Sequence, residues 1–204
     1  MKQDMEEQIL QAAECLFLEK GYNMTSTVEI ARKVGCNQAL VHYYFHTKEN
    51  LFILVFMKKV IAFVSAFAYV DTSDGDFFTR LAKRINRHFD EVAKSPKIPF
   101  LIINDLMLNR ERRLLLRERI VEDAHYKALY RKFDEEVKAE IAKGNIRPIT
   151  SVDLLLNLVS LDVVAFLSEP IILDMVDNLP FDKDEFLEHR RKVIIDTMIA
   201  SLRP

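Results

Sequence analysis

Two short helical patterns separated by a tight turn lie near the N-terminus, and they constrain the fold more than any other feature. Ser26 with Glu29 three residues later forms a capping-box signature before VEIARKV, whose apolar spacing predicts a short helix. Gly35 ends this helix, and Asn37 can cap a second one, QALVHYYF. Two helices joined across so short a break are typical of a helix-turn-helix unit.

Helical periodicity continues on both sides of this unit. The apolar spacing predicts a first helix over residues 4–20 that Gly21 stops, and Thr47 can cap a fourth helix that runs to about residue 70. The segment DTSDGD, residues 71–76, is rich in turn formers and is the clearest linker. The chain therefore divides into residues 1–47 and a body of residues 48–204, with the fourth helix connecting them.

The body is also predicted to be helical. Ser95, Pro96 and Pro99 interrupt its pattern, and FLIINDLML and the charged run RERRLLLRERI follow. Its longest predicted helices cover residues 76–94, about 119–143, 151–168 and 182–202. The 151–168 pattern is apolar nearly all round, so we expect burial on most sides, and Pro170 should break that helix.

Composition favours an all-α soluble protein. Only four glycines and six prolines occur in 204 residues, and the formal charge is −2. Residues 51–70 are the most apolar, but Lys58 and Lys59 at their centre favour a buried helix over a membrane span. Two cysteines make no disulfide framework, and the N-terminus does not resemble a secretory signal, so we expect a cytoplasmic protein without a membrane partner.

Enzyme and metal signatures are missing from the sequence. The scattered glycines form neither a phosphate-cradling loop nor a nucleophile elbow, and the five histidines match no triad. His42 and His46 have a spacing that can hold a metal, but no further ligand completes a set. We therefore expect no catalytic residue, no cofactor and no metal.

Residues 21–52, GYNMTSTVEIARKVGCNQALVHYYFHTKENLF, resemble the N-terminal signature of the TetR family of transcriptional regulators. The resemblance implies a homodimer whose helix-turn-helix units bind a palindromic operator in double-stranded DNA. It also implies a larger domain that binds a small-molecule effector, and a repressor is the usual form. An activator, or a regulator that acts through protein contacts without a ligand, remains an alternative.

Position-by-position matching to the family assigns the DNA contacts. They are Thr25, Thr27, Asn37, Gln38, Ala39, Leu40, His42, Tyr43 and Lys48. Gln38 can pair with adenine, and Ala39 and Leu40 can contact a thymine methyl group, although Leu40 and Tyr43 can equally pack inward. His42 departs from the tyrosine that many members carry. Residues 1–50 hold five Lys plus Arg against seven acids, which argues against strong nonspecific affinity for DNA.

The resemblance also implies a ligand pocket and a dimer interface in the body. Aromatic, aliphatic and a few polar side chains are the pocket candidates, which favours a hydrophobic effector. They are Phe63, Phe67, His88, Phe89, Phe100, Asn104, Met107, Tyr126, Tyr130 and Phe166. Asp162 is either a paired buried carboxylate or the partner of a cationic ligand. The interface candidates, on the last two helices, are Leu154, Leu158, Leu161, Ile194, Met198 and Leu202.

Overall fold

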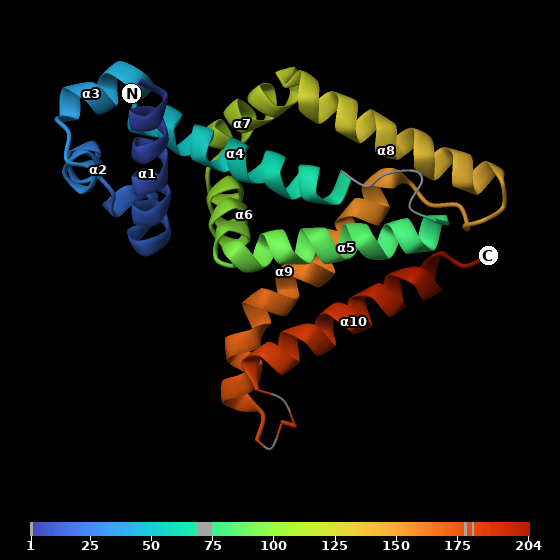
Figure 1. Cartoon of the computed structure of the whole chain (residues 1–204). Coiled ribbons are helices and arrows are strands. Elements are labelled where there is room, and N and C mark those ends of the chain that lie inside the picture. Colours follow the sequence, from blue (N-terminus) through green and yellow to red (C-terminus); the bar gives the residue numbers. More distant parts are fainter. Residues whose placement is uncertain (1, 69–74, 178, 181) are drawn as a thin grey trace. The chain divides into compact units, whose positions relative to one another are not determined.

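The computed structural model describes the whole chain except residues 1, 69–74, 178 and 181, and its regular elements within the described ranges are ten helices (Figure 1). The all-α prediction is confirmed. Most of the predicted linker 71–76 lies outside the described residues. Its last residue, Asp76, caps the next helix, since its carboxylate accepts a hydrogen bond from the Thr79 N–H at 2.8 Å.

The helices pack into two compact units. Unit 1 comprises residues 1–60 and 101–122, and unit 2 comprises residues 61–100 and 123–204. Unit 1 holds α1 (Lys2–Met24), α2 (Thr27–Val34), α3 (Gln38–Phe45), the first part of α4 (Lys48–Ala68), most of α6 (Ile98–Leu108) and α7 (Arg110–Glu122). Unit 2 holds the rest of α4, α5 (Phe77–Lys94), α8 (Ala124–Ala142), α9 (Ser151–Met175) and α10 (Lys183–Leu202). Packing thus groups α6 and α7 with the N-terminal helices, whereas the predicted division follows residue 47.

The caps predicted for the short helices are present. Ser26 and Glu29 form the reciprocal capping box at the start of α2, with N–H···O distances of 3.2 and 3.1 Å. Gly35 ends α2 with a φ of 80°, a left-handed conformation that favours glycine. The Asn37 side chain accepts a hydrogen bond from the Leu40 N–H at 2.8 Å and starts α3.

Two predicted helix boundaries are wrong. The pattern over about 119–143 is two helices, because Asp123 accepts a hydrogen bond from the Tyr126 N–H at 2.7 Å and begins α8. The helix predicted to end before Pro170 continues to Met175. Pro170 is exposed, so its missing N–H costs one helical hydrogen bond without a clash against the core, and burial of Phe166 and Glu169 favours the continuous helix.

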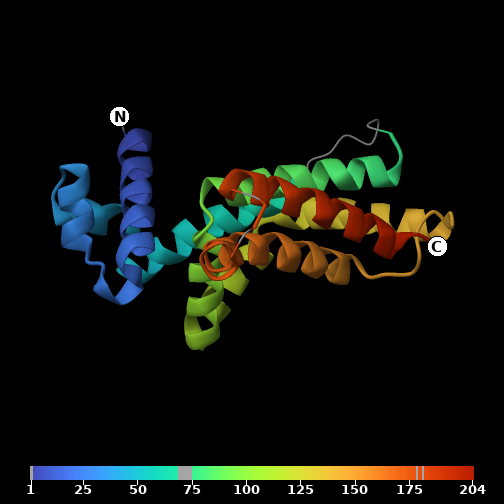
Figure 2. The same ribbon diagram turned by 90° about the horizontal axis from the view of Figure 1, so that it is seen from below.

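The core of unit 2 is formed where α5, α9 and α10 pack together, with α8 against α9 (Figure 2). Apolar side chains from these helices and from the end of α4 fill it. Its members include Phe67, Leu81, Ile85, Phe89, Phe133, Leu154, Leu158, Phe166, Ile194, Met198 and Leu202. This single cluster ties the last two helices to the rest of the unit.

Two helices, Lys48–Phe67 and Ser151–Met175, are long and apolar enough to cross a membrane by length and composition alone. In the structure the first half of α4 is packed inside unit 1, where Leu51, Phe52 and Phe56 are fully buried. This agrees with the prediction of a buried helix. Part of the apolar surface of α9 is exposed, which differs from the expected burial on most sides.

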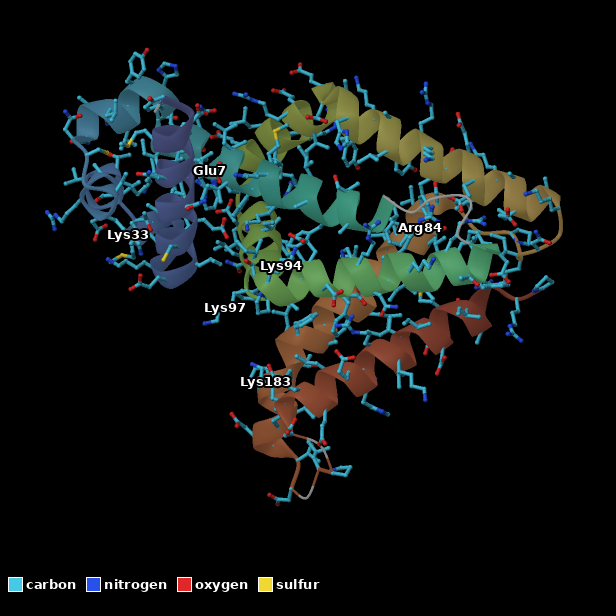
Figure 3. The ribbon with its side chains drawn as sticks, viewed as in Figure 1. Glu7, Lys33, Arg84, Lys94, Lys97 and Lys183 are labelled. Atoms are coloured by element: carbon cyan, nitrogen blue, oxygen red, sulfur yellow. The ribbon has the colours of Figure 1, made fainter. Side chains whose placement is uncertain are left out.

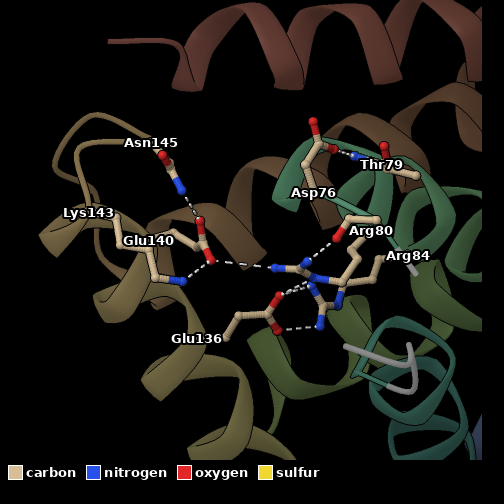
Figure 4. Close-up of polar contacts among 9 residues, drawn as sticks. Asp76, Thr79, Arg80, Arg84, Glu136, Glu140, Lys143 and Asn145 are labelled. Carbon is tan, nitrogen blue, oxygen red and sulfur yellow. Dashed lines mark hydrogen bonds and ion pairs between the residues drawn. The ribbon is translucent and has the colours of Figure 1, made fainter. Parts of the chain in front are cut away.

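A buried ion-pair cluster joins α5 to α8 in unit 2 (Figure 4). Arg84 is 1% exposed, and it and Arg80 bond the same carboxylate, Glu136, at distances from 2.5 to 3.1 Å. Burial raises the pKa of Glu136, but the hydrogen bonds and charges of the two arginines outweigh it and hold the pKa below its ordinary value. The carboxylate is therefore the charge that keeps two guanidinium groups inside the unit.

Replacing Glu136 by Gln should leave the buried Arg84 without a carboxylate partner and Arg80 with Glu140 alone, 3.5 Å away, and should lower the free energy of unfolding by about 3–5 kcal/mol. Urea unfolding at pH 7 measures this loss. The matched control, Glu135→Gln, removes a carboxylate from the exposed side of the same helix and should cost less than about 1 kcal/mol. Because the pKa of Glu136 is lowered on folding, its contribution is complete above the unfolded pKa and is lost as the pH falls through the folded pKa. Equal losses for both variants would contradict this account.

Candidate nucleic-acid interface

The helix α3 presents one face to solvent and buries the other. Gln38, Ala39, His42 and Tyr43 are exposed, and Tyr43 is 62% exposed. Val41 and Phe45, on the opposite face, are each 1% exposed. Leu40 lies half-buried between the two faces. The structure therefore brings four of the predicted DNA-contacting side chains together on one exposed surface.

Hydrogen bonds link the polar side chains of this surface. The Gln38 amide nitrogen donates to Thr27 Oγ1 at 3.0 Å and lies 3.2 Å from His42 Nε2. His42 Nδ1 lies 2.9 Å from the carbonyl oxygen of His46. Because a carbonyl oxygen only accepts, Nδ1 carries the proton, and Nε2 of the neutral ring accepts from Gln38. Both amide donors of Gln38 are thus engaged, and pairing with adenine requires it to leave His42 or Thr27.

Thr25 and Asn37 hold the backbone behind this surface. Thr25 is 2% exposed, and its hydroxyl donates to the carbonyl oxygens of Leu16 at 3.1 Å and Gly21 at 2.8 Å. Asn37 is exposed, but its side-chain oxygen caps α3. Hydrogen bonds within the chain are therefore sufficient to explain why both residues occur here.

The Lys48 ammonium group also faces inward. It donates to the carbonyl oxygens of Tyr22 and Thr25, each at 3.0 Å, and lies 4.1 Å from the centre of the Tyr22 ring. Burial and the positive charge of Arg112 lower the pKa of Lys48. The predicted phosphate contact of this ammonium group therefore competes with bonds inside unit 1.

Several acids of unit 1 are paired with lysines. Glu7 contacts Lys58, Glu14 lies 2.8 Å from Lys59, and Glu29 lies 2.8 Å from Lys20. Arg32 and Lys33 are exposed in the last turn of α2, with the Lys33 ammonium group 2.8 Å from Cys15 Sγ (Figure 3). Arg32 and Lys33 thus remain exposed basic residues of α2 although the region is negative overall.

Sequence reasoning missed Arg112 as a partner of the helix-turn-helix. Its guanidinium carbon lies 4.1 Å from the centre of the Tyr22 ring, on a different helix far along the chain. The charged run RERRLLLRERI contains five arginines, and periodicity alone does not distinguish Arg112 among them. In the sequence, Tyr22 is distinguished only as one of the residues that carry the resemblance to the TetR family.

The predicted pocket residues divide into buried and exposed groups. Phe67, His88, Phe89 and Phe166 are 1–7% exposed and lie in unit 2, where Phe63 packs beside them. Tyr126 and Tyr130 are half-buried, and Tyr130 shares a 3.1 Å hydrogen bond with Ser151. Phe100, Asn104 and Met107, all on α6, are exposed. Two grooves described in unit 2 are lined by other residues.

His88 and Asp162 form a buried pair at the centre of unit 2. Nδ1 of the histidine and Oδ2 of the carboxylate are 2.6 Å apart, and Asp162 is 0% exposed. Burial raises the pKa of Asp162, against the lowering effects of His88 and Arg191. Of the two roles considered for Asp162, the structure shows the paired buried carboxylate.

Most of the predicted dimer residues lie in the core of their own chain. Leu154, Leu158, Ile194, Met198 and Leu202 are 0–2% exposed, and Leu161 packs against the same cluster. Contacts within one chain therefore explain their apolar character. The apolar side chains that α9 leaves exposed are at other positions: Val152, Leu156, Val159, Val164, Ile171 and Met175.

Comparison with known proteins finds a family that the N-terminal helices resemble. Residues 9–55, which include α2, α3 and most of α1, match the family described as "Bacterial regulatory proteins, tetR family". The N-terminal region of the chain is therefore similar to the TetR family. The description of that family is one of regulatory proteins.

Two curated relatives are similar to this chain over part of their length. It is 29% identical over 115 residues to the fatty acid metabolism regulator protein of Bacillus subtilis, which covers 56% of the chain and 58% of that protein. It is 40% identical over 50 residues to the HTH-type transcriptional regulator QacR of Staphylococcus aureus, which covers 24% of the chain and 27% of QacR. The matches thus span less than two thirds of either relative.

Solved structures share the fold over nearly the whole chain. A TetR-family regulator from Marinobacter aquaeolei has a TM-score of 0.69 at 16% identity, covering 99% of this chain and 98% of that one. The fatty acid degradation regulator FadR from Bacillus halodurans has a TM-score of 0.66 at 20% identity, covering 93% and 94%. At these identities the likeness establishes the fold of the chain and not its ligand.

Proposed function

We propose that this protein is a cytoplasmic transcriptional repressor that binds a palindromic operator as a homodimer and responds to a small hydrophobic effector. The observation that carries the proposal is the exposed face of α3, where Gln38, Ala39, His42 and Tyr43 lie together above a fully buried opposite face. A helix displayed in this way fits the major groove of DNA.

The chemistry of the α3 face suits base and phosphate contacts. The Gln38 amide pairs with adenine once it leaves Thr27 or His42, and the Ala39 methyl group contacts a thymine methyl group. The exposed Tyr43 hydroxyl and the nearby Arg32 and Lys33 are suited to phosphate oxygens. The base-reading groups are few, so sequence preference should depend strongly on Gln38.

A second copy of the chain is the proposed partner of α9. Val152, Leu156 and Val159 are 49%, 58% and 37% exposed and recur at spacings of four and three, which places them on one stripe of the helix. Further along, a groove of about 440 Å³ is lined by α9 and α10 residues that include Leu161, Val164 and Phe186. We propose that the interface of the last two helices uses the exposed stripe of Val152, Leu156 and Val159, and that the predicted core leucines support it from beneath.

The proposed effector is a fatty acyl compound that binds in unit 2. The Bacillus subtilis relative is by name a regulator of fatty acid metabolism, and a structural neighbour is by name a regulator of fatty acid degradation. The interior of unit 2 is aromatic and aliphatic, with Phe67, Phe89 and Phe166 in one cluster, and an acyl chain that enters it must displace part of this packing. These points select the class of compound to test first.

Selection of duplexes from a random DNA pool with the purified protein tests operator binding. We expect a palindromic site, and Gln38→Ala should change the preferred base at one position per half-site, at a cost of about 1–3 kcal/mol in discrimination. Gln8→Ala, an exposed glutamine on α1, is the control and should select the wild-type site. Enrichment of no sequence, with or without acyl compounds present, would contradict the proposal.

Long-chain fatty acyl compounds should change the affinity for the selected duplex, because a ligand that prefers one of two conformations shifts their populations. Fluorescence anisotropy with labelled duplex, titrated with fatty acyl-CoA of increasing chain length, measures the change. For a repressor that is released by its effector, affinity should fall as chain length grows. An unchanged affinity at all lengths would contradict the proposed effector class and leave DNA binding intact.

Leu156→Glu should convert the dimer to a monomer, since it places a charge in the middle of the proposed apolar interface. Sedimentation velocity measures the change at several protein concentrations. The control is Leu114→Glu, a similarly exposed leucine on α7, which should sediment like the wild type. A dimer that survives Leu156→Glu would contradict the assignment of this face.

A further inference from the structure

The Tyr22 ring is held between two cations from different helices. Lys48 Nζ, at the start of α4, and Arg112 Cζ, on α7, each lie 4.1 Å from the ring centre. Tyr22 stands just before the turn that leads into α2, and all three residues belong to unit 1. Both contacts are within the range of a cation–π attraction. Lys48, Tyr22 and Arg112 thus form a clamp at the entry to the helix-turn-helix, and Arg112 comes from outside that unit.

Arg112 is fixed in place by a buried carboxylate. Its Nε and Nη2 donate to the two oxygens of Asp105, at 2.8 and 2.7 Å, in a bidentate pair. Asp105 is 9% exposed, Glu49 Oε1 lies 3.8 Å from the guanidinium group, and the Phe52 ring lies 5.4 Å from it. An arginine with two fixed hydrogen bonds and two aromatic neighbours has little freedom to move away from α6 and α7.

Lys48 connects the clamp to the contacts that lead to α3. Its ammonium group binds the carbonyl oxygens of Tyr22 and Thr25, which flank the break between α1 and α2. The next contact, from Thr27 at the start of α2 to Gln38 on α3, is the 3.0 Å hydrogen bond described above. Continuous contacts therefore run from Arg112 to the exposed face of α3.

We propose that Arg112 is a positioning residue for DNA binding, which sets the orientation of α2 and α3 through Tyr22 and Lys48 without touching DNA. The inference rests on the proposed function. It also assigns the Lys48 ammonium group to the same internal clamp. Arg112 and Lys48 repel each other, and Asp105 and Glu49 balance their charge, so the loss of any one member disturbs the clamp.

The salt dependence of DNA binding separates positioning from phosphate contact. A side chain that neutralises a phosphate contributes about one unit to the slope of log affinity against log salt. Arg112→Gln should lower the affinity for the wild-type duplex by between about two- and thirty-fold, as expected for residues that couple sites without contacting the ligand, and leave that slope unchanged. Lys48→Ala should behave in the same way.

Matched variants sharpen the test. Arg117→Gln removes the same charge from an exposed position on α7 and should bind the duplex as the wild type does. Arg112→Lys keeps the charge and loses the planar bidentate fork, so its affinity should lie between those of the wild type and Arg112→Gln. Asp105→Asn removes the anchor and should resemble Arg112→Gln.

Hydrogen exchange gives a second readout that needs no DNA. Amides of residues 22–34 should exchange faster in Arg112→Gln than in the wild type, while those of α10 stay unchanged. If circular dichroism shows that Arg112→Gln does not fold, the affinity and hydrogen-exchange measurements are made on Arg112→Lys and Asp105→Asn instead.

Three outcomes would overturn the inference: unchanged affinity in Arg112→Gln, a salt slope reduced by about one unit, or unchanged exchange over residues 22–34. A wild type that binds no duplex would instead contradict the proposed function. The exchange measurement then decides whether Arg112 positions the helix-turn-helix.

Discussion

The burial of Val41 and Phe45 in unit 1 is the contact on which the candidate interface depends. A helix of eight residues such as α3 has almost no stability of its own in water, so its conformation and its orientation come from packing and caps. With these two side chains fixed inward, helical geometry turns Gln38, Ala39 and His42 toward solvent. The exposed face is therefore a consequence of the core beneath it.

Unit 1 stabilises this arrangement with polar contacts that sequence matching assigned to DNA. Thr25 and Lys48 satisfy backbone carbonyl groups around the break between α1 and α2, and Thr27 is bonded to Gln38. Gln38 and the Thr25 hydroxyl group cannot donate to DNA and keep all of these bonds at once, whereas the Lys48 ammonium group uses only two of its three N–H donors in them. The affinity for DNA then depends on the difference in free energy between hydrogen bonds within the protein and hydrogen bonds to DNA. Arg112, on α7, contacts residues that make the internal bonds and can therefore influence the affinity.

The sequence predicted local structure well where the signal was local. The capping box at Ser26, the turn at Gly35 and the cap at Asn37 each depend on residues within four positions, and all three are present. Pro170 and Asp123 show the limit of propensity. It places a helix boundary at Pro170, where burial of neighbouring side chains favours a continuous helix, and it passes over Asp123, whose side chain caps α8. The grouping of α6 and α7 with the N-terminal helices depends on contacts such as Arg112 with Tyr22, which periodicity does not encode.

The dimer and pocket assignments show a different limit. Apolar periodicity identifies side chains that avoid water, but it does not tell whether they pack against their own chain or another. Leu154 and Leu158 satisfy that requirement inside unit 2, and Leu156, between them in sequence, remains exposed. Which apolar residue is left for a partner becomes clear only from the three-dimensional packing.

The central claim is that two copies of the α3 face bind successive major grooves of one duplex. Hydroxyl-radical footprinting of the bound duplex tests it most directly. The account predicts two protected patches related by two-fold symmetry, with centres separated by one helical turn, about 34–36 Å, or a multiple of it. A single patch, or protection that extends evenly along the duplex, would contradict it.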